Sequence, residues 1–411
     1  MTADGQKRLA MLSVHSCPMG NLGARDTGGM SVYIREVARE LGKQGLLVDV
    51  YTRVHDPKDG QIVKLGQNAR LIHLRAGEDE DIHKLAVYLH LPEFACNLEN
   101  FRKNNGLQYD LIFSHYWLSG CVGEYLKCWW NVPHVTMFHT LGAVKNAIGI
   151  GEDEPELRIE NERQIVKDCD YIITATEKEK DDLILHYGGS PERIGVIPCG
   201  VNLDLFQPMD KKMAKQQLDF SEDKLILFVG RIEPLKGIDQ LLRTMPYLPN
   251  GQGIRLVIIG GDENSQNEID RLQRLSRELH IEDSVTFSGL IQHERLPYFY
   301  NAADVCVVPS YYESFGLVAL ESISCGTPVV ATNVGGLKSI IRQGKTGYVV
   351  MDNAAHHLAD KIALLLSKPS SDMKSALTIR ASVTRFSWPN IARAIIKQCK
   401  LVSADYYAQV H

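Results

Sequence analysis

The sequence has no apolar run long enough to cross a membrane as a helix, and its nine cysteines include no Cys-x-x-Cys pair. The cysteines are scattered and odd in number, which fits reduced thiols better than a disulfide framework or a metal site. A formal net charge of -5 argues against a general nucleic-acid surface. We therefore expect a cytoplasmic globular protein with no metal, no nucleic-acid partner and no stable membrane insertion.

The sequence also lacks a Gly-x-Gly-x-x-Gly fingerprint followed by an acidic residue. That fingerprint holds the pyrophosphate of a dinucleotide at the start of a helix. Its absence argues against an NAD-dependent oxidoreductase. Thermal stabilisation by NAD would be the cheap test of that alternative.

A chain of 411 residues is too long for one ordinary core, which predicts two domains. Strand-like apolar runs alternate with helix-like segments, as is typical of parallel sheets covered by helices. The pattern restarts after Pro208. We therefore predict an α/β fold of two Rossmann-like, doubly wound domains that face a cleft, at 1–200 and 201–389. The helical segment 390–411 is expected to return to the first domain and complete it.

Short apolar runs are expected to form the strands of both sheets. In the first domain these are Leu9–Val14, Leu47–Thr52, Leu71–Leu74, Asp110–Ser114, His134–His139, Tyr171–Thr176 and Ile194–Ile197. In the second they are Leu225–Val229, Arg255–Ile259, Val285–Ser288, Asp304–Val308, Val329–Ala331 and Tyr348–Val350. The polar segment Lys211–Leu218 is interpreted as a linker between the two sets.

The stretch from Glu313 to Glu321 reads Glu-Ser-Phe-Gly-Leu-Val-Ala-Leu-Glu and lies between two apolar runs. Residues from Gly316 onward suit a short helix, so one carboxylate lies in the loop after a strand and the other inside the helix. Free N–H groups of Phe315, Gly316 and Leu317 would form an anion site where the helix begins. Carboxylates beside it suit sugar hydroxyls. The alternative is a solvated Glu313 and a Glu321 on an exposed helix face.

The loop Gly230–Gly237 follows the first strand of the second domain and contains Arg231 and Lys236. Two cations that converge on a diphosphate would neutralise the charge that develops on a leaving nucleotide. The alternative is a pair of solvated surface cations.

The sequence Asp26-Thr-Gly-Gly-Met30 joins the first strand to the first helix. Gly28 and Gly29 let the backbone pass close to a ligand, and the helix start supplies a positive dipole. The alternative is a glycine turn that is needed only for packing.

His139 ends an apolar run, which places it at the cleft, although a single histidine there is more often structural than catalytic. Arg158-Ile-Glu160 opens the next helical stretch, and its alternative interpretation is an ordinary surface ion pair.

These segments together resemble the retaining glycosyltransferases of the GT-B fold, of the family 4 (group 1) type. That group includes sucrose-phosphate synthase and the inositol-phosphate glycosyltransferase of mycothiol synthesis. The resemblance spans both domains and is carried by Asp26–Met30, His139-Thr140, Arg158–Glu160, Gly230-Arg231, Lys236-Gly237 and Glu313–Glu321.

The resemblance implies a role for each motif. Arg231 and Lys236 would clamp the diphosphate, and Glu321 would bind the ribose. Glu313 and the backbone at 315–317 would hold the donor sugar. His139 would lie beside that sugar, with Gly28 and Gly29 along the phosphates or the acceptor pocket.

The resemblance further implies a retaining reaction with no required metal or cofactor, in which a nucleotide diphosphate sugar, expected to be a UDP-sugar such as UDP-glucose, is a co-substrate. The first domain would bind the acceptor and the second the donor. In the inositol-phosphate enzymes four side chains grip an acceptor phosphate. The matching positions here are Lys84, Tyr116, Thr140 and Arg158.

We therefore expect a hexosyltransferase that acts on a small phosphorylated sugar or polyol, and a homodimer is possible. A glycosyltransferase with a lipid-linked acceptor is the first alternative. A non-catalytic sugar-nucleotide sensor is the second, and turnover of any donor would exclude it.

Overall fold

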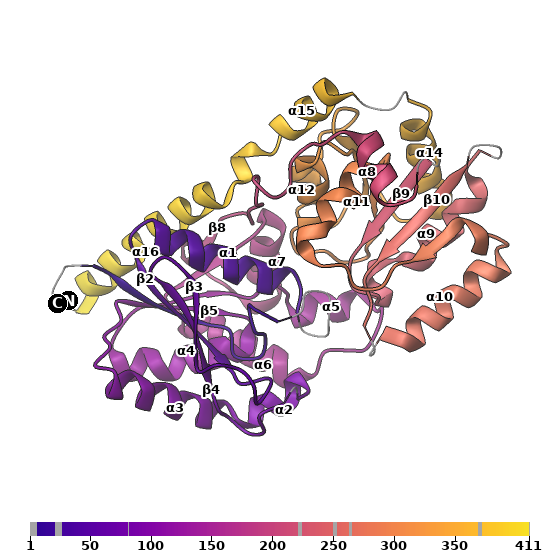
Figure 1. The fold of residues 1–411 in the computed structure, drawn as a ribbon. Coiled ribbons are helices and arrows are strands. Elements are labelled where there is room, and N and C mark those ends of the chain that lie inside the picture. The colour runs from indigo at the N-terminus through magenta and orange to yellow at the C-terminus, as the bar shows by residue number, and fades with distance from the viewer. Residues whose placement is uncertain are drawn as a thin grey trace.

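The computed structural model describes residues 6–20, 27–80, 82–220, 224–249, 253–262, 265–368 and 372–410. Its strands form two separate sheets, and helices cover both of them (Figure 1). The predicted α/β fold with two parallel-sheet domains is therefore confirmed. The boundaries drawn after residues 200 and 389 remain predictions.

The first sheet has eight strands in the order β3-β4-β2-β1-β5-β6-β7-β8. They are β1 (Arg8–Leu12), β2 (Leu47–Arg53), β3 (Ile62–Gly66), β4 (Ala69–Leu74), β5 (Leu111–His115), β6 (His134–Met137), β7 (Tyr171–Thr174) and β8 (Ile194–Val196). Neighbouring strands are parallel, except that β3 runs antiparallel to β4. The sequence analysis did not identify β3, because this edge strand is largely exposed and so lacks the apolar run of a buried strand.

The second sheet has six parallel strands in the order β11-β10-β9-β12-β13-β14. They are β9 (Lys224–Val229), β10 (Ile254–Ile259), β11 (Val285–Phe287), β12 (Val305–Val308), β13 (Val329–Thr332) and β14 (Gly347–Val350). Every apolar run predicted as a strand of this domain forms one, within a few residues at each end. The central strands are buried on both faces, as continuous runs of Val, Ile and Leu require.

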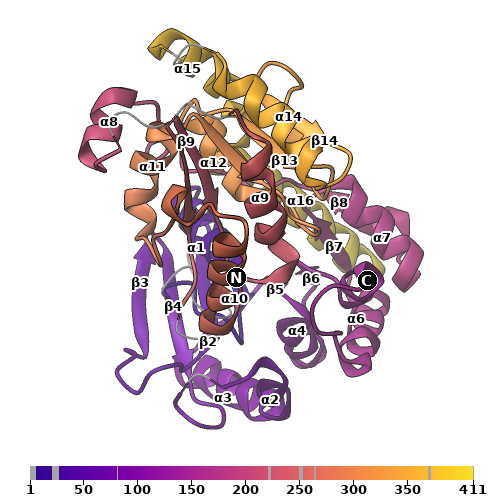
Figure 2. The same cartoon turned by 90° about the vertical axis from the view of Figure 1, so that its right-hand side faces the viewer.

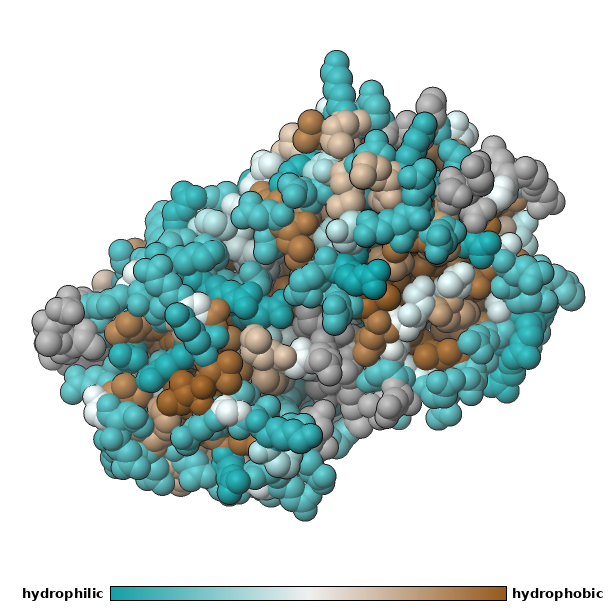
Figure 3. All heavy atoms as spheres, viewed as in Figure 1, coloured by the Kyte–Doolittle hydropathy of each residue, from teal (hydrophilic) through white to brown (hydrophobic). Residues whose placement is uncertain are grey.

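The helices of the first half of the chain are α1 (Gly29–Lys43), α2 (Lys84–Leu89), α3 (Leu91–Asn104), α4 (Trp117–Trp130), α5 (Gly142–Ile148), α6 (Glu156–Asp168) and α7 (Glu177–Tyr187). Those that follow are α8 (Lys211–Gln217), α9 (Ile238–Thr244), α10 (Gln266–Glu278), α11 (Leu296–Ala302), α12 (Leu317–Ser324), α13 (Leu337–Ile340), α14 (Ala355–Leu366), α15 (Met373–Ala381) and α16 (Trp388–Val410). Within the described residues, no helix is both long enough and apolar enough to span a membrane. Figure 3 shows that hydrophilic residues cover most of one face, with hydrophobic patches on both domains.

The interpretation of Lys211–Leu218 as a linker is wrong. This segment forms α8 and packs against α11. Asp304 explains the difference, because its carboxylate binds Lys211 at 3.2 Å and Lys215 at 2.9 Å. The polar character that looked like a linker in the sequence therefore supplies partners for a buried acid.

The C-terminal helix α16 returns to the first sheet and packs along α1 (Figure 2). It begins at Trp388, whose ring lies against Gly200, where an added Cβ would come within 2.4 Å of the indole. The backbone N–H of Val201 donates to the carbonyl of Phe386 at 2.8 Å. The chain therefore crosses from one domain to the other twice, and the two connecting segments are hydrogen-bonded to each other.

Candidate active site

A pocket of about 340 Å³ lies between the two domains and is lined by residues from both. It collects loops that follow the carboxyl ends of β5, β6, β9 and β12, where open α/β sheets bind their ligands. All the residues predicted to form the site line it: Gly28, Gly29, Lys84, Tyr116, His139, Thr140, Arg158, Arg231, Lys236, Glu313, Phe315, Gly316, Leu317 and Glu321. Their individual roles remain predictions.

The glycine loop brings the two domains close together. Gly28 caps α1, and a Cβ added to Gly29 would lie 3.2 Å from the Leu317 side chain at the start of α12. The start of α1 thus approaches the start of α12 across the pocket. Asp26, the first residue of the predicted motif, lies outside the described residues.

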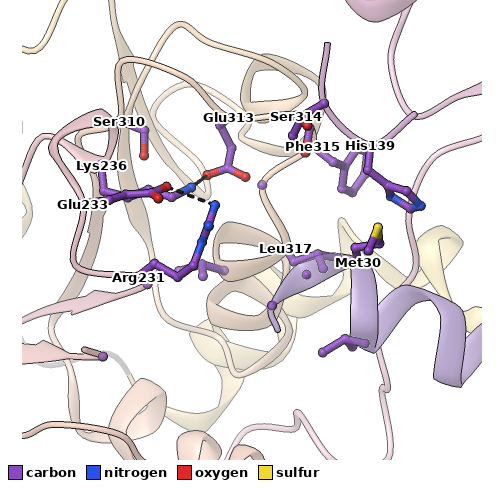
Figure 4. A pocket seen from close by; sticks show the side chains of 18 of the residues that line it. Met30, His139, Arg231, Glu233, Lys236, Ser310, Glu313, Ser314, Phe315 and Leu317 are labelled. Carbon is purple, nitrogen blue, oxygen red and sulfur yellow. Dashed lines mark hydrogen bonds and ion pairs between the residues drawn. The ribbon is translucent and has the colours of Figure 1, made fainter. Parts of the chain in front are cut away.

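The two predicted diphosphate cations each pair with a carboxylate. Lys236 donates to Glu313 at 2.8 Å, and Arg231 lies 3.0 Å from Glu233. Figure 4 shows these four side chains pointing toward one another, with His139 and Met30 on the opposite side of the pocket. The two cations therefore lie on the same side of the pocket in two ion pairs, and their convergence on a diphosphate stays a prediction.

Gly237 holds Lys236 in place from the backbone side. Its φ is 65°, and an added Cβ would come within 2.2 Å of the Pro309 carbonyl oxygen. Only glycine satisfies both conditions without strain. The loop that carries Lys236 is thereby pressed against the segment that follows β12 and leads to Glu313.

Glu321 lies in α12 and is nearly buried. One of its carboxylate oxygens lies 3.1 Å from His293 Nε2, and the other accepts a hydrogen bond from Tyr300 at 2.8 Å. Burial by itself would lower the pKa of His293, but the hydrogen bond and charge of Glu321 outweigh it and raise that pKa. Each carboxylate oxygen has a second lone pair, so ribose hydroxyls can still bind.

Backbone geometry sets the start of α12. Gly316 has a φ of 103°, and an added Cβ would lie 2.6 Å from Leu337. The Phe315 side chain is buried against Phe386, so this residue can offer a ligand only its backbone. The use of the backbone N–H groups at 315–317 by a ligand stays a prediction.

His139 follows β6 with a φ of 63°, which is uncommon for a residue other than glycine. The predicted strand His134–His139 therefore ends earlier, at Met137. His139 Nε2 lies 3.0 Å from Nδ1 of His115, and burial lowers the pKa of His139 to about 3. A neutral ring can assist a reaction through hydrogen bonds rather than through charge.

Arg158 is the centre of the predicted acceptor site and is 1% exposed. Its Nη2 donates to the carbonyl and the hydroxyl of Thr140, at 2.8 and 3.0 Å. Its guanidinium lies 4.8 Å from the ring centre of Tyr116. Arg158 does form an ion pair, with Glu162, but both side chains are buried, so the alternative of an ordinary surface pair is wrong about the location only.

Two buried carboxylates bind the same guanidinium. Arg158 Nε donates to Glu162 at 2.7 Å, and Nη1 lies 2.9 Å from Glu154. Glu154 also binds Lys145, and both of its oxygens lie 3.4 Å from Lys84 Nζ. Burial tends to raise the pKa of Glu154, but these three cations lower it to about 2.

Two family models match the chain: "Glycosyl transferases group 1" over residues 210–381 and "Glycosyltransferase Family 4" over residues 27–205. D-inositol 3-phosphate glycosyltransferase from Mycobacterium tuberculosis strain H37Ra is 38% identical, over 99% of this chain and 86% of that protein. The enzyme of that name from Corynebacterium glutamicum is 36% identical, over 93% of each. The chain belongs to the group 1 glycosyltransferases.

Solved structures agree with the family. Sucrose-phosphate synthase from Thermosynechococcus elongatus is 34% identical and superimposes with a TM-score of 0.89, over 97% of this chain and 100% of that one. Anabaena HepE, in complex with UDP and glucose, has a TM-score of 0.77 at 18% identity, which shows the fold alone.

The sequence analysis missed several side chains of this glycosyltransferase. They are His115, Lys145, Glu154, Glu162, Glu233, His293 and Tyr300. All but Lys145 contact a predicted site residue, and Lys145 contacts Glu154. Glu233 lies inside the loop 230–237 but was given no role, and the others lie outside the residues that carry the resemblance. A search for carboxylates within a helical turn of Arg158 would have found both of its partners.

Proposed function

We propose that this glycosyltransferase moves a sugar, with retention of configuration, from a UDP-sugar to a small phosphorylated polyol or sugar. The observation that carries the acceptor part is that Lys84, Tyr116, Thr140 and Arg158 lie on one wall of the pocket, with Tyr116 and Arg158 buried. A guanidinium binds phosphate in a bidentate manner, and hydroxyl groups complete the coordination.

The names of the relatives support a phosphate on the acceptor side. The inositol 3-phosphate enzymes and sucrose-phosphate synthase both handle phosphorylated compounds. The shared chemistry is a phosphate monoester next to hydroxyl groups, so inositol phosphates and hexose phosphates are the acceptors to screen.

The opposite wall of the pocket supports a nucleotide diphosphate donor. Arg231 and Lys236 can bind the diphosphate and stabilise it as it leaves, and Glu321 can bind the ribose hydroxyls. Because the donor ligands lie in the second domain and His139 in the first, the reaction requires both domains to meet at one sugar.

The test has three steps. A thermal-shift screen of UDP, GDP, ADP and their sugars identifies the donor. Turnover is then compared for phosphorylated acceptors and their unphosphorylated forms, with and without EDTA, and NMR determines the anomeric configuration of the product. We expect stabilisation by a UDP compound, preference for the phosphorylated acceptor, undiminished turnover in EDTA, and retention.

Equal use of both acceptor forms would contradict the phosphate site and favour a neutral or lipid-linked acceptor. If the protein binds a donor but neither transfers its sugar to any acceptor nor hydrolyses it, the sugar-nucleotide sensor is favoured.

A further inference from the structure

Lys84, Lys145 and Arg158 form a group that we call the cation cluster. They come from α2, α5 and α6, and all three line the pocket. The carboxylate of Glu154 lies at their common point, bound to each of them. Its side chain is only 4% exposed, so it lies inside the pocket wall rather than in solvent.

Glu162 contacts the same arginine but is held differently. Its carboxylate binds the backbone N–H of Gly142 at 3.0 Å, the Tyr187 hydroxyl and Arg158 Nε. These donors belong to three different helices, and Glu162 is completely buried and does not line the pocket. Glu162 therefore binds Nε of the guanidinium from inside the protein, whereas Glu154, which lines the pocket, binds Nη1.

The backbone of Glu154 is held by hydrogen bonds that do not involve its carboxylate. The Asn146 side chain donates to the Glu154 carbonyl at 2.9 Å and accepts from the Glu154 N–H at 2.7 Å. Among the described residues, the partners given for the side-chain carboxylate are Lys84 Nζ, Lys145 Nζ and Arg158 Nη1. Rotation about its own bonds would release it from the cation cluster without a change of fold.

We propose that Glu154 is an internal stand-in for the acceptor phosphate, which competes for the cation cluster and turns away when a phosphorylated acceptor binds. This inference rests on the proposed function. A phosphate carries a charge of about -1.5 to -2 and three acceptor oxygens, so it can displace a single carboxylate. A neutral hydroxyl group cannot. Glu154 thus holds the buried Arg158 and the two partly buried lysines together and offsets part of their charge. It sets a threshold that only a multiply charged ligand passes.

The test is isothermal titration of inorganic phosphate into the wild-type protein, E154Q and E152Q. Glu152 lies exposed on the same loop, so E152Q removes one charge outside the cation cluster and serves as the control. Because the competing charge is removed, we expect E154Q to bind phosphate about tenfold more tightly than the wild type. E152Q should bind phosphate like the wild type.

Equal or weaker phosphate binding by E154Q, where the wild type does bind, overturns the stand-in role and leaves the proposed function intact. If neither protein binds phosphate, both proposals fail.

Thermal unfolding gives a second measurement. E154Q should have a lower Tm than the wild type in phosphate-free buffer, because the three cations of the cluster lose their shared partner. Phosphate should raise its Tm more than that of the wild type. If E154Q does not fold without phosphate, refolding in phosphate is the deciding experiment. Recovery of the fold supports the inference, and no recovery overturns it.

Discussion

The two walls of the pocket use the same residue types in opposite environments. On the second domain, Arg231 and Glu233 have side chains that are 47% and 29% exposed. On the first domain, the corresponding fractions for Arg158 and Glu162 are 1% and 0%. Charges in water can be rearranged at little cost, whereas breaking a buried pair leaves an uncompensated charge. We therefore expect the first-domain wall to be coupled to folding, and the second-domain wall to rearrange with its ligand.

The largest expected effect is the replacement Arg158→Ala. It leaves two carboxylates buried without their shared cation, which typically costs about 3–5 kcal/mol of unfolding free energy. Urea denaturation measures this loss, and kcat/KM for the phosphorylated acceptor should fall while donor affinity hardly changes. Arg163→Ala, exposed on the same helix, is the control and should stay within about 0.5 kcal/mol of the wild type. Similar stabilities for the two variants would remove the contrast between the walls.

Lys236→Ala should show the opposite pattern, with a large loss of turnover and little loss of stability. The cation matters most as charge develops on the leaving diphosphate, and one such contact is typically worth about 2.7–4 kcal/mol of barrier. Steady-state kinetics and denaturation on the same samples separate the two effects. The control is Lys212→Ala, which removes an exposed lysine of α8. Near-normal turnover of the Lys236→Ala variant would show that Lys236 does not stabilise a leaving diphosphate.

Gly237→Ala tests whether the backbone nonetheless positions the loop 230–237 on the second-domain wall of the pocket. The added Cβ meets the Pro309 carbonyl in a left-handed conformation, so we expect a cost of about 1–3 kcal/mol and reduced turnover. Gly188→Ala is the matched control, because its φ of 68° is similar and no atom lies within 4 Å of the added Cβ. Equal losses in both variants would show that the close approach to Pro309 contributes nothing.

The smallest expected effect concerns His293, whose folded-state pKa is raised by Glu321. A raised pKa adds stability that is complete below the unfolded value of about 6.5 and is lost as the pH rises through the folded value. Unfolding free energy should therefore decline with rising pH in this window for the wild type. The decline should be weaker in His293→Gln. Identical pH profiles would show that the ion pair contributes no stability.

The sequence predicted much of the fold and the outline of the site. Buried strands such as β9 and β12 could be predicted because each is a continuous run of apolar residues. The segments 230–237 and 313–321 each carry their site residues within a few positions, so local pattern and the family resemblance located them. The structure adds that they meet in one pocket.

Some partners of the site residues could not be predicted, because they come from distant parts of the chain. Glu321 meets His293 from another segment, and His139 meets His115 across two strands. Exposed elements were missed for a different reason: β3 gains its order from pairing with β4, and α8 from Asp304. Neither contact leaves a periodic signal in the sequence.

The two connecting segments between the domains, which are hydrogen-bonded at Val201 and Phe386, have a mechanical consequence. A single connecting segment would let one domain swivel and twist freely relative to the other. Two connecting segments that are hydrogen-bonded to each other restrict the relative motion of the domains. Rotation of one domain about the line of these segments is then the motion we expect to cost least. We therefore expect any closure of the pocket to follow the same path each time, so that its two walls meet in one register.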